Sequence, residues 1–348
     1  MGQVDVVQLE QGAKFTSEWR TENSDSWLHA AVPTPRSSAR YRPVAGLAEQ
    51  IQQRFGIPPE RYDLVVGRHL LATCQIAPLK GPPVLVDLDD FKYRYAAGAP
   101  LTPALLKERL LKSVAHWVAR RQLDRFDAAF FVSPQDQQEH PIARSMVLRN
   151  VPWSMPEQRP APIPGKNLLF VGSLWYRPNA AGVEWFLAKV WPRVLEAEPA
   201  ASLTLVGAAS PDLRARWAAH RQVKAPGFVD DLGAAYANAA VVIAPIHSGG
   251  GTNIKVLEAL AHGRPCVTTD FSYAALADCL ESGRDVLVAH DADAFARDCI
   301  AVLQEPQRHE SVGAAGFEAA RRHFGRDGFI DSVERMARSL VSQPRSSQ

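Results

Sequence analysis

The sequence predicts an α/β protein made of two doubly wound, Rossmann-like domains. Short apolar runs alternate with segments of helical period along nearly the whole chain, which is typical of a parallel sheet covered by helices. A proline-rich stretch without periodicity divides the chain into halves of similar size, each with its own series of apolar runs. The length of 348 residues also exceeds what one hydrophobic core usually serves.

The expected strands are short runs that are apolar on both faces, as in a covered parallel sheet. In the first half they are Val4–Leu9, Asp63–Val66, Val84–Leu88, Ala128–Val132 and Met146–Leu148. In the second half they are Asn167–Val171, Ser202–Val206, Val241–Ala244, Pro265–Thr268 and Asp285–Val288.

These runs and the proline-rich stretch set the expected domain boundaries. We expect an N-terminal domain over residues 1–151, a stiff linker over 152–165 (PWSMPEQRPAPIPG) and a C-terminal domain over 166–325. A last helix over 326–341 follows the second strand series. It can pack on either domain, including back on the N-terminal one, and the sequence leaves that choice open.

Composition excludes several classes of protein. A net charge of +2, with 46% hydrophobic and 22% charged residues, is ordinary for a soluble globular protein and gives no basis for wrapping nucleic acid. The four cysteines are scattered, without the spacing of a zinc site. We see no signal peptide and no apolar run of the ~20 residues that a membrane helix needs. A cytoplasmic protein is therefore expected, at most peripheral at the inner face of the membrane.

The segment His247–Leu260 (HSGGGTNIKVLEAL) has the pattern of an anion site. A buried strand is followed by three glycines, by Thr252 and Asn253, which are good helix N-cap residues, and by a helical run. Free backbone N–H groups and the positive end of the helix dipole favour a diphosphate there. The alternative is a glycine-rich turn that only closes a strand–helix connection.

Two charged residues follow the glycines on the same helix. Lys255, in the first turn, can add positive charge to a phosphate site. Glu258, one turn further, can accept hydrogen bonds from ribose hydroxyls.

The same residues carry a family resemblance. The run GTNIKVLEALAHGRPCVTT resembles the donor-site helix of glycosyltransferase family 4, among the group 1 glycosyl transferases of the GT-B fold. FVGSLWYRPNAAGVEWFL and APGFVDDLGAAYANAAVVIAPI resemble other units of that family's C-terminal domain. The likeness covers Lys166–Leu340, whereas the N-terminal half matches only loosely.

The resemblance implies two domains facing each other across a cleft, with a nucleotide-sugar on the C-terminal domain and the acceptor on the N-terminal one. No cofactor is expected beyond the nucleoside diphosphate sugar as co-substrate, and no metal. The implied donor-binding residues are Gly172, Ser173, Arg177, Phe228, Val229, Ser248, Gly249, Gly250, Gly251, Thr252, Asn253, Lys255 and Glu258.

The chain departs from the family pattern in several places. Family members commonly carry a glutamate where this chain has Gly250, eight positions before Glu258. An Arg and a Lys that often bind the diphosphate are replaced by Ser173 and Pro178, and Arg177 or Lys255 can compensate. The N-terminal domain is short at its start compared with family members.

The candidate catalytic residues lie in the N-terminal half. Asp87, Asp89 and Asp90 lie at the C-terminal end of a buried strand, where the family often has a His, and they can position an acceptor or act as a base. A magnesium site and a solvated helix cap are the alternatives. His69, after another strand, is a candidate acid or base, although such a His is more often structural. His247, beside the glycine loop, is a candidate of the same kind.

The predicted helix Pro103–Phe126 is amphipathic and basic. One interpretation is contact with an anionic membrane that carries a lipid-linked acceptor. The preferred interpretation is a helix whose apolar residues Leu106, Leu110, Val114, Trp117 and Val118 pack in the core and whose basic face is solvated.

The functional hypothesis is a glycosyltransferase of polysaccharide biosynthesis, hexosyltransferase-like. It would move a sugar from a nucleoside diphosphate sugar to a hydroxyl of a glycan, lipid-linked or small-molecule acceptor, with retention of anomeric configuration. The alternatives are a non-catalytic GT-B-like binding or scaffold protein with a degenerate donor site, and a GT-B sugar-nucleotide epimerase. Nucleic acid is not an expected partner.

Overall fold

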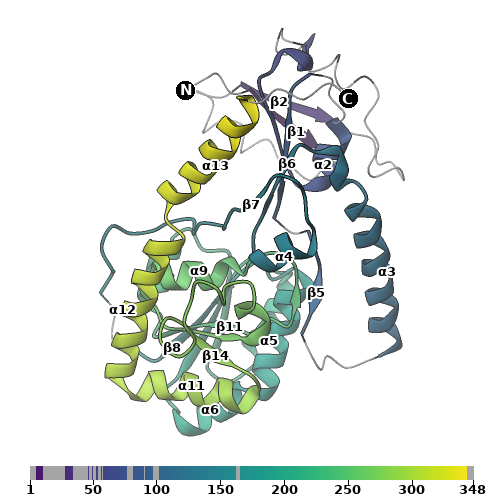
Figure 1. The fold of residues 1–348 in the computed structure, drawn as a ribbon. Coiled ribbons are helices and arrows are strands. Elements are labelled where there is room, and N and C mark those ends of the chain that lie inside the picture. Colours follow the sequence, from purple (N-terminus) through teal and green to yellow (C-terminus); the bar gives the residue numbers. More distant parts are fainter. Residues whose placement is uncertain are drawn as a thin grey trace.

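The structure is a computed structural model that describes residues 5–10, 28–33, 46, 49, 52–53, 56, 58–76, 81–89, 91–96, 102–161 and 165–342. Two parallel sheets with their own helices lie one above the other (Figure 1). The architecture is therefore the predicted pair of α/β units. A separate parallel pair, β1 (Asp5–Glu10) with β2 (Leu28–Pro33), lies near the N-terminal sheet.

In the described part of the chain, the N-terminal sheet has four parallel strands in the order β3-β4-β6-β7. The strands are β3 (Val65–Arg68), β4 (Val84–Leu88), β6 (Ala128–Phe131) and β7 (Ser145–Val147). On one face, α2 (Leu70–Ile76), the end of α3 (Pro103–Arg120) and the short turn η3 (Leu123–Arg125) cover the sheet. The helix α4 (Pro134–Glu139) follows β6.

The last helix, α13 (Arg326–Val341), covers the other face of the N-terminal sheet. Its Met336 and Leu340 are buried against Leu85 and Phe130. The chain therefore returns from the C-terminal domain to the N-terminal one, as the yellow helix in Figure 1 shows. The sequence left this partner open because both sheets offer an apolar face.

The C-terminal sheet has six parallel strands in the order β10-β9-β8-β11-β13-β14. The strands are β8 (Asn167–Val171), β9 (Ser202–Val206), β10 (Val223–Gly227), β11 (Val241–Ala244), β13 (Cys266–Thr269) and β14 (Leu287–Ala289). The helices are α5 (Arg177–Lys189), α6 (Trp191–Ala197), α7 (Pro211–Ala218), α8 (Leu232–Ala237), α9 (Ile254–Ala261), α10 (Asp270–Tyr273), α11 (Ala292–Gln304) and α12 (Pro306–His323). Apolar clusters fill both faces of this sheet.

The linker is fastened to the C-terminal domain rather than free. Arg264 is fully buried, and its Nη2 donates to the carbonyl oxygen of Pro160 at 2.6 Å. Arg159 forms an ion pair with Glu310. The proline-rich linker therefore packs along α9 and α12 of the C-terminal domain. Its residues 162–164 lie outside the described part.

The preferred interpretation of the helix α3, with its apolar residues packed in the core, is wrong. The helix ends at Arg120, and of its residues only Ala119 is buried. The apolar side chains Leu106, Leu110, Val114 and Trp117 are 49 to 65% exposed. Only the last turn reaches the core, because the helix runs down the outside of the molecule past the N-terminal sheet (Figure 1).

A two-stranded antiparallel pair joins the domains. The strand β5 (Arg94–Tyr95) from the N-terminal domain pairs with β12 (Ser248–Gly249) from the glycine-rich loop. The backbone N–H of Ala96 also donates to the carbonyl oxygen of His247 at 2.7 Å. Among the helices that the structure describes, none combines the length and apolar character that crossing a membrane requires.

Candidate functional site

Glycines end three neighbouring strands of the C-terminal sheet. Gly172 follows β8, Gly207 follows β9 and Gly227 ends β10. Gly207 has φ +141°, and a Cβ there would lie 1.8 Å from the carbonyl oxygen of Gly172. This bare edge adjoins the point between β8 and β11 where the strand order reverses, which is where α/β sheets bind ligands.

The glycine-rich loop follows β11 on the other side of that point. Its first part is committed to β12, so Ser248 and Gly249 are not free as the sequence suggested. In the described part of the chain, the N–H groups of Gly250, Gly251 and Thr252 donate no hydrogen bond. Asn253 stands at the N-cap of α9, but its side chain does not cap the helix and its Nδ2 donates to Ser272 instead. The N-terminus of α9 is therefore open to an anion.

Lys255 lies in the first turn of α9 with its side chain buried beneath the β8 edge. A Cβ built on Gly172 would lie 3.4 Å from its Cε, and its Nζ lies 5.7 Å from the Phe170 ring centroid. Nζ donates to Asn253 Oδ1 at 3.4 Å, a long bond that leaves most of its capacity unused. Burial lowers the pKa of Lys255 to about 8. A phosphate at this edge would supply the missing counter-charge.

Glu258 lies one turn further along α9 and faces the linker. Its Oε1 accepts a hydrogen bond from the backbone N–H of Trp153. Burial raises the pKa of Glu258. Among the described residues Oε2 has no hydrogen-bond partner, so the carboxylate can still accept a hydroxyl.

The other implied donor residues lie around the same edge with different neighbours. Ser173 is exposed, and so is the ring of Phe228, whereas Val229 packs on the C-terminal core. Arg177 forms an ion pair with Glu108 of α3. Its charge is thus engaged with the N-terminal domain rather than with the loop after β8.

Asp89 connects the N-terminal sheet to the glycine-rich loop. Asn150 donates from Nδ2 to Asp89 Oδ1 and to Thr252 Oγ1, both at 2.8 Å. Arg68 approaches the other carboxylate oxygen, Nη2 to Oδ2, at 3.4 Å. Asp89 thus faces the residue that precedes the α9 N-cap. Sequence reasoning missed Asn150, although VLRNVP ends a predicted strand.

Asp87 and His69 lie at the same edge of the N-terminal sheet. The backbone N–H of His69 donates to the carbonyl oxygen of Asp87 at 2.9 Å. Burial, and then the charge of Asp89, raise the pKa of Asp87. His69 is exposed with φ +65°, a strained conformation for a non-glycine residue, and shares a hollow of about 210 Å³ with Asp89. Asp90 lies outside the described residues.

A cavity of about 350 Å³ lies between the domains, on the β13–β14 side of the glycine-rich loop. Among the N-terminal residues that line it are Arg94, Ser133 and Asp136. Among the C-terminal ones are Trp185, His247, Gly249, Gly250, Gly251, Thr269, Asp270 and His290. Gly172, Ser173, Phe228 and Lys255 do not line it, so the loop separates this cavity from the strand edge.

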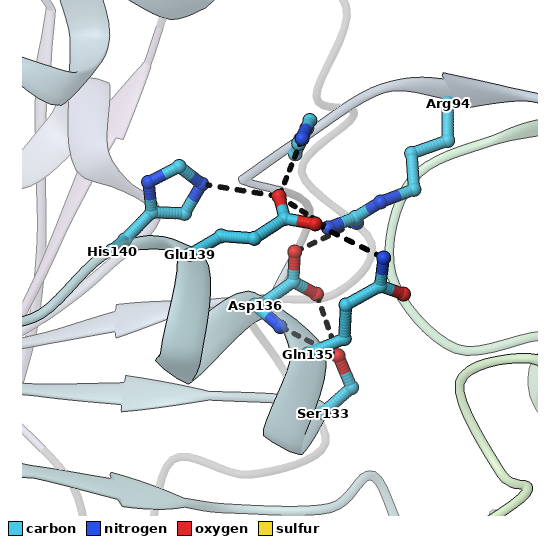
Figure 2. Close-up of polar contacts among 7 residues, drawn as sticks. Arg94, Ser133, Gln135, Asp136, Glu139 and His140 are labelled. Carbon is cyan, nitrogen blue, oxygen red and sulfur yellow. Dashed lines mark hydrogen bonds and ion pairs between the residues drawn. The ribbon is translucent and has the colours of Figure 1, made fainter.

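The N-terminal wall of the cavity is a charged network (Figure 2). Arg94 contacts buried Asp136, Nη1 to Oδ1, at 2.7 Å, and donates from Nη2 to Glu139 at 3.1 Å. Ser133 caps α4 by accepting from the N–H of Asp136, and its hydroxyl donates to Asp136 Oδ2 at 2.9 Å. This network was not predicted, although Ser-Pro-Gln-Asp after a buried strand is a helix-capping signal.

His247 and Trp185 form the opposite wall. Their rings meet edge to face, with centroids 4.6 Å apart. Nε2 of His247 is buried and has no hydrogen-bond partner within the described part of the chain, and burial lowers the pKa of this His. The cavity therefore combines an aromatic ring with carboxylates, which suits a polyhydroxylated ligand. No group of three or more His, Cys, Asp or Glu among the described residues is placed to hold a metal ion.

Comparisons with known proteins point to one family. Residues 165–305 match the family model described as Glycosyl transferases group 1. An uncharacterized 44.6 kDa protein in the cps region of Klebsiella pneumoniae is 29% identical over 176 residues. That alignment covers 48% of this chain and 45% of the relative, so the chain spans less than half of the relative's length.

Solved glycosyltransferase-type structures share the fold. HepE of Anabaena, solved with UDP-glucose, is similar with TM-score 0.63 at 14% identity, over 97% of this chain and 100% of that one. Sucrose-phosphate synthase of Thermosynechococcus elongatus gives TM-score 0.63 at 17% identity, over 84% and 76%. TarM of S. aureus, solved with fondaparinux, alpha-GlcNAc-glycerol and UDP, gives TM-score 0.57 at 11% identity, over 74% and 51%. The fold is GT-B.

Proposed function

We propose, taking as premise that residues 165–305 belong to the glycosyl transferases group 1 family, that this chain is a glycosyltransferase. Its donor would be a nucleoside diphosphate sugar, and we choose a UDP-sugar because similar structures were solved with UDP or UDP-glucose. The cps-region relative supports a reaction in polysaccharide biosynthesis. A hexosyl donor and retention of configuration are parts of the proposal that rest on the family resemblance.

One observation carries the proposal: no side chain caps the N-terminus of α9, and the buried ammonium of Lys255 beside it has unused hydrogen-bonding capacity. Among the described residues Lys255 makes one long hydrogen bond, and the N–H groups of Gly250, Gly251 and Thr252 have no acceptor. A diphosphate would satisfy both at once, and the bare glycine edge at Gly172 lets it approach the backbone. The nucleoside would continue along β8–β10 toward Glu258 and Phe228.

The chemistry follows from this placement. The bond between the anomeric carbon and the diphosphate oxygen breaks, and a bond from that carbon to the acceptor oxygen forms. The leaving diphosphate gains negative charge as this happens, where Lys255 and the helix N-terminus stabilise it. The acceptor's proton passes to the departing phosphate oxygen or to Asp89, which faces Thr252 through Asn150.

The interdomain cavity is our proposed place for the saccharide. Carboxylates of Asp136 and Asp270 can accept hydrogen bonds from sugar hydroxyls, and the Trp185 ring offers an apolar wall. The reacting hydroxyl of the acceptor would lie at the glycine-rich loop, on the side where Asp89 faces Thr252 through Asn150. We propose a glycan or lipid-linked glycan as acceptor.

Calorimetric titration with UDP and GDP tests the donor site. We expect UDP to bind, and Glu258→Ala to weaken binding about tenfold by removing a ribose acceptor. Glu258→Gln is the matched control, because it keeps an acceptor for the Trp153 N–H and preserves more affinity. Unchanged affinity in both variants with an unchanged melting temperature would refute the ribose assignment.

The same titration decides between an enzyme and a scaffold. Gly250, Ser173 and Pro178 stand where the family commonly has charged contacts, and Arg177 is engaged with Glu108. No heat at millimolar UDP or GDP would favour a scaffold with a degenerate donor site. Turnover of the UDP-sugar to its epimer without any acceptor would favour an epimerase.

A further inference from the structure

The helix α3 presents an apolar face to solvent and turns Glu108 and Arg109 toward the protein. Leu106, Leu110, Val114 and Trp117 lie at helical spacing on one face and are about half exposed or more. Leu111 is exposed beside them. A solvent-facing helix normally has the opposite arrangement, so this face needs an apolar partner.

Contacts on the inner face of α3 explain why its apolar side chains face solvent. Glu108 accepts from the Tyr95 hydroxyl at 3.0 Å and pairs with Arg177 of the C-terminal domain. Arg109 lies over the Tyr95 ring at 4.8 Å, and Lys112 lies over the Tyr93 ring at 4.3 Å. Polar and aromatic contacts therefore hold the helix against β5, and its apolar stripe faces away from the molecule.

The charges around the stripe indicate which partner it fits. Lys107 and Arg120 are exposed on α3, and Arg121 follows at its C-cap with its guanidinium 3.7 Å from the Trp117 ring centroid. The one acidic residue in the helix, Glu108, is turned inward and paired. The exposed cations around the stripe outnumber the one exposed carboxylate beside it, Asp124, which shares a hollow with Trp117 and Arg121. Leucines with a tryptophan and an excess of exposed cations match the boundary between acyl chains and anionic headgroups.

We propose that α3 docks this protein on an anionic lipid surface, with the stripe formed by Leu106, Leu110, Val114 and Trp117 inserted among the acyl chains. Lys107, Arg120 and Arg121 then contact the headgroups. The helix lies in the plane of the interface rather than across the bilayer, since it has 18 residues and carries several charges.

Docking through α3 has a consequence for the interdomain cavity. The inner face of α3 contacts Tyr95 of β5, and both residues of β5, Arg94 and Tyr95, line that cavity. The membrane would therefore lie one helix away from the proposed saccharide site. An acceptor carried on a lipid would reach the site without leaving the bilayer.

Cosedimentation of the full chain with vesicles tests the proposal without reference to activity. We expect binding to vesicles of phosphatidylcholine and phosphatidylglycerol in equal parts, and much less to phosphatidylcholine alone. Trp117→Glu and Leu110→Glu should each reduce binding to the anionic vesicles about tenfold, because a carboxylate replaces inserted apolar surface. Trp175→Glu, at an exposed Trp on the C-terminal domain, is the matched control and should bind as the wild type does.

Three outcomes would overturn the proposal. The first is a wild-type chain that does not sediment with anionic vesicles at low salt, or variants that sediment as it does. The second is a wild-type dimer in solution that Trp117→Glu converts to a monomer, which would assign the stripe to a second copy of this chain. The third is a large fall in melting temperature for Trp117→Glu, which would mean that the chain itself covers the stripe. The titration with UDP tests the proposed donor site separately, so the failure of membrane docking and the failure of the proposed function can be told apart.

Discussion

Lys255→Met should stabilise the fold while weakening the site. The folded protein lowers the pKa of Lys255 from 10.5 to about 8, because burial disfavours the charged form. Lys255 is buried, and among the described residues its one hydrogen bond is 3.4 Å long. A difference of that size corresponds to about 3 kcal/mol of destabilisation at pH 7. Methionine fills similar volume without the charge.

The stability gained by Lys255→Met should depend on pH. Below pH 8 the lysine is charged in both folded and unfolded chains, so the cost of burying it is fully present. Between pH 8 and 10.5 the folded state releases its proton first, and the cost falls to ~1 kcal/mol near pH 9.5. The stabilisation by Lys255→Met should therefore shrink as pH rises through this window.

The assay is urea denaturation at pH 7 and pH 9.5, paired with UDP titration. We expect a gain of about 3 kcal/mol at pH 7, a clearly smaller gain at pH 9.5, and a tenfold to hundredfold loss of UDP affinity (of the order of one charged hydrogen bond). Lys224→Met, at an exposed lysine of β10, is the control and should show neither effect. Equal gains at both pH values, or a less stable Lys255→Met, would refute the burial reasoning.

Three further predictions concern the N-terminal domain. Asp89→Asn should lower kcat for transfer at least ~10-fold with little change in UDP affinity, if its carboxylate serves the acceptor side. His140→Phe should reduce acid sensitivity: burial lowers the pKa of His140 to about 4, so the wild type loses stability as pH falls from 6.5 toward 4, and urea midpoints across that range would show it. Gly67→Ala should destabilise by ~2 kcal/mol, because its Cβ would lie 2.0 Å from Thr73 Oγ1; an unchanged melting temperature would contradict this.

Much of the fold could be predicted from the sequence because both sheets are buried on two faces. The strands β4, β8, β9 and β11 match the expected runs residue for residue, since continuous apolar runs have few other solutions. The strand β10 was missed. Its sequence VKAPG contains a charge and a proline, which only an edge strand tolerates.

The helix α3 shows why amphipathic patterns alone mislead. Periodicity identified the two faces correctly but not which of them faces the core. That choice depends on Tyr95 and Tyr93, whose contacts with Glu108, Arg109 and Lys112 hold the polar face inward. These contacts lie far enough apart in the sequence that no local pattern reveals them.

The candidate site also has a part that the sequence predicts and a part that it does not. The loop after β11 and its helix were predictable because glycines, cap residues and a lysine follow one another in the chain. Its pairing with β5, the bridge from Asp89 through Asn150, and the cavity wall of Arg94 and Asp136 are tertiary contacts. Sequence separations of tens to more than a hundred residues hide them.

The return of α13 to the first sheet orders events during synthesis. Met336 and Leu340 cover Leu85 and Phe130, so that face of the N-terminal sheet stays bare while the ribosome makes the whole second domain. The C-terminal domain has both of its faces covered by its own helices and can complete folding first. The N-terminal domain therefore completes its packing only after the last helix of the chain has been made.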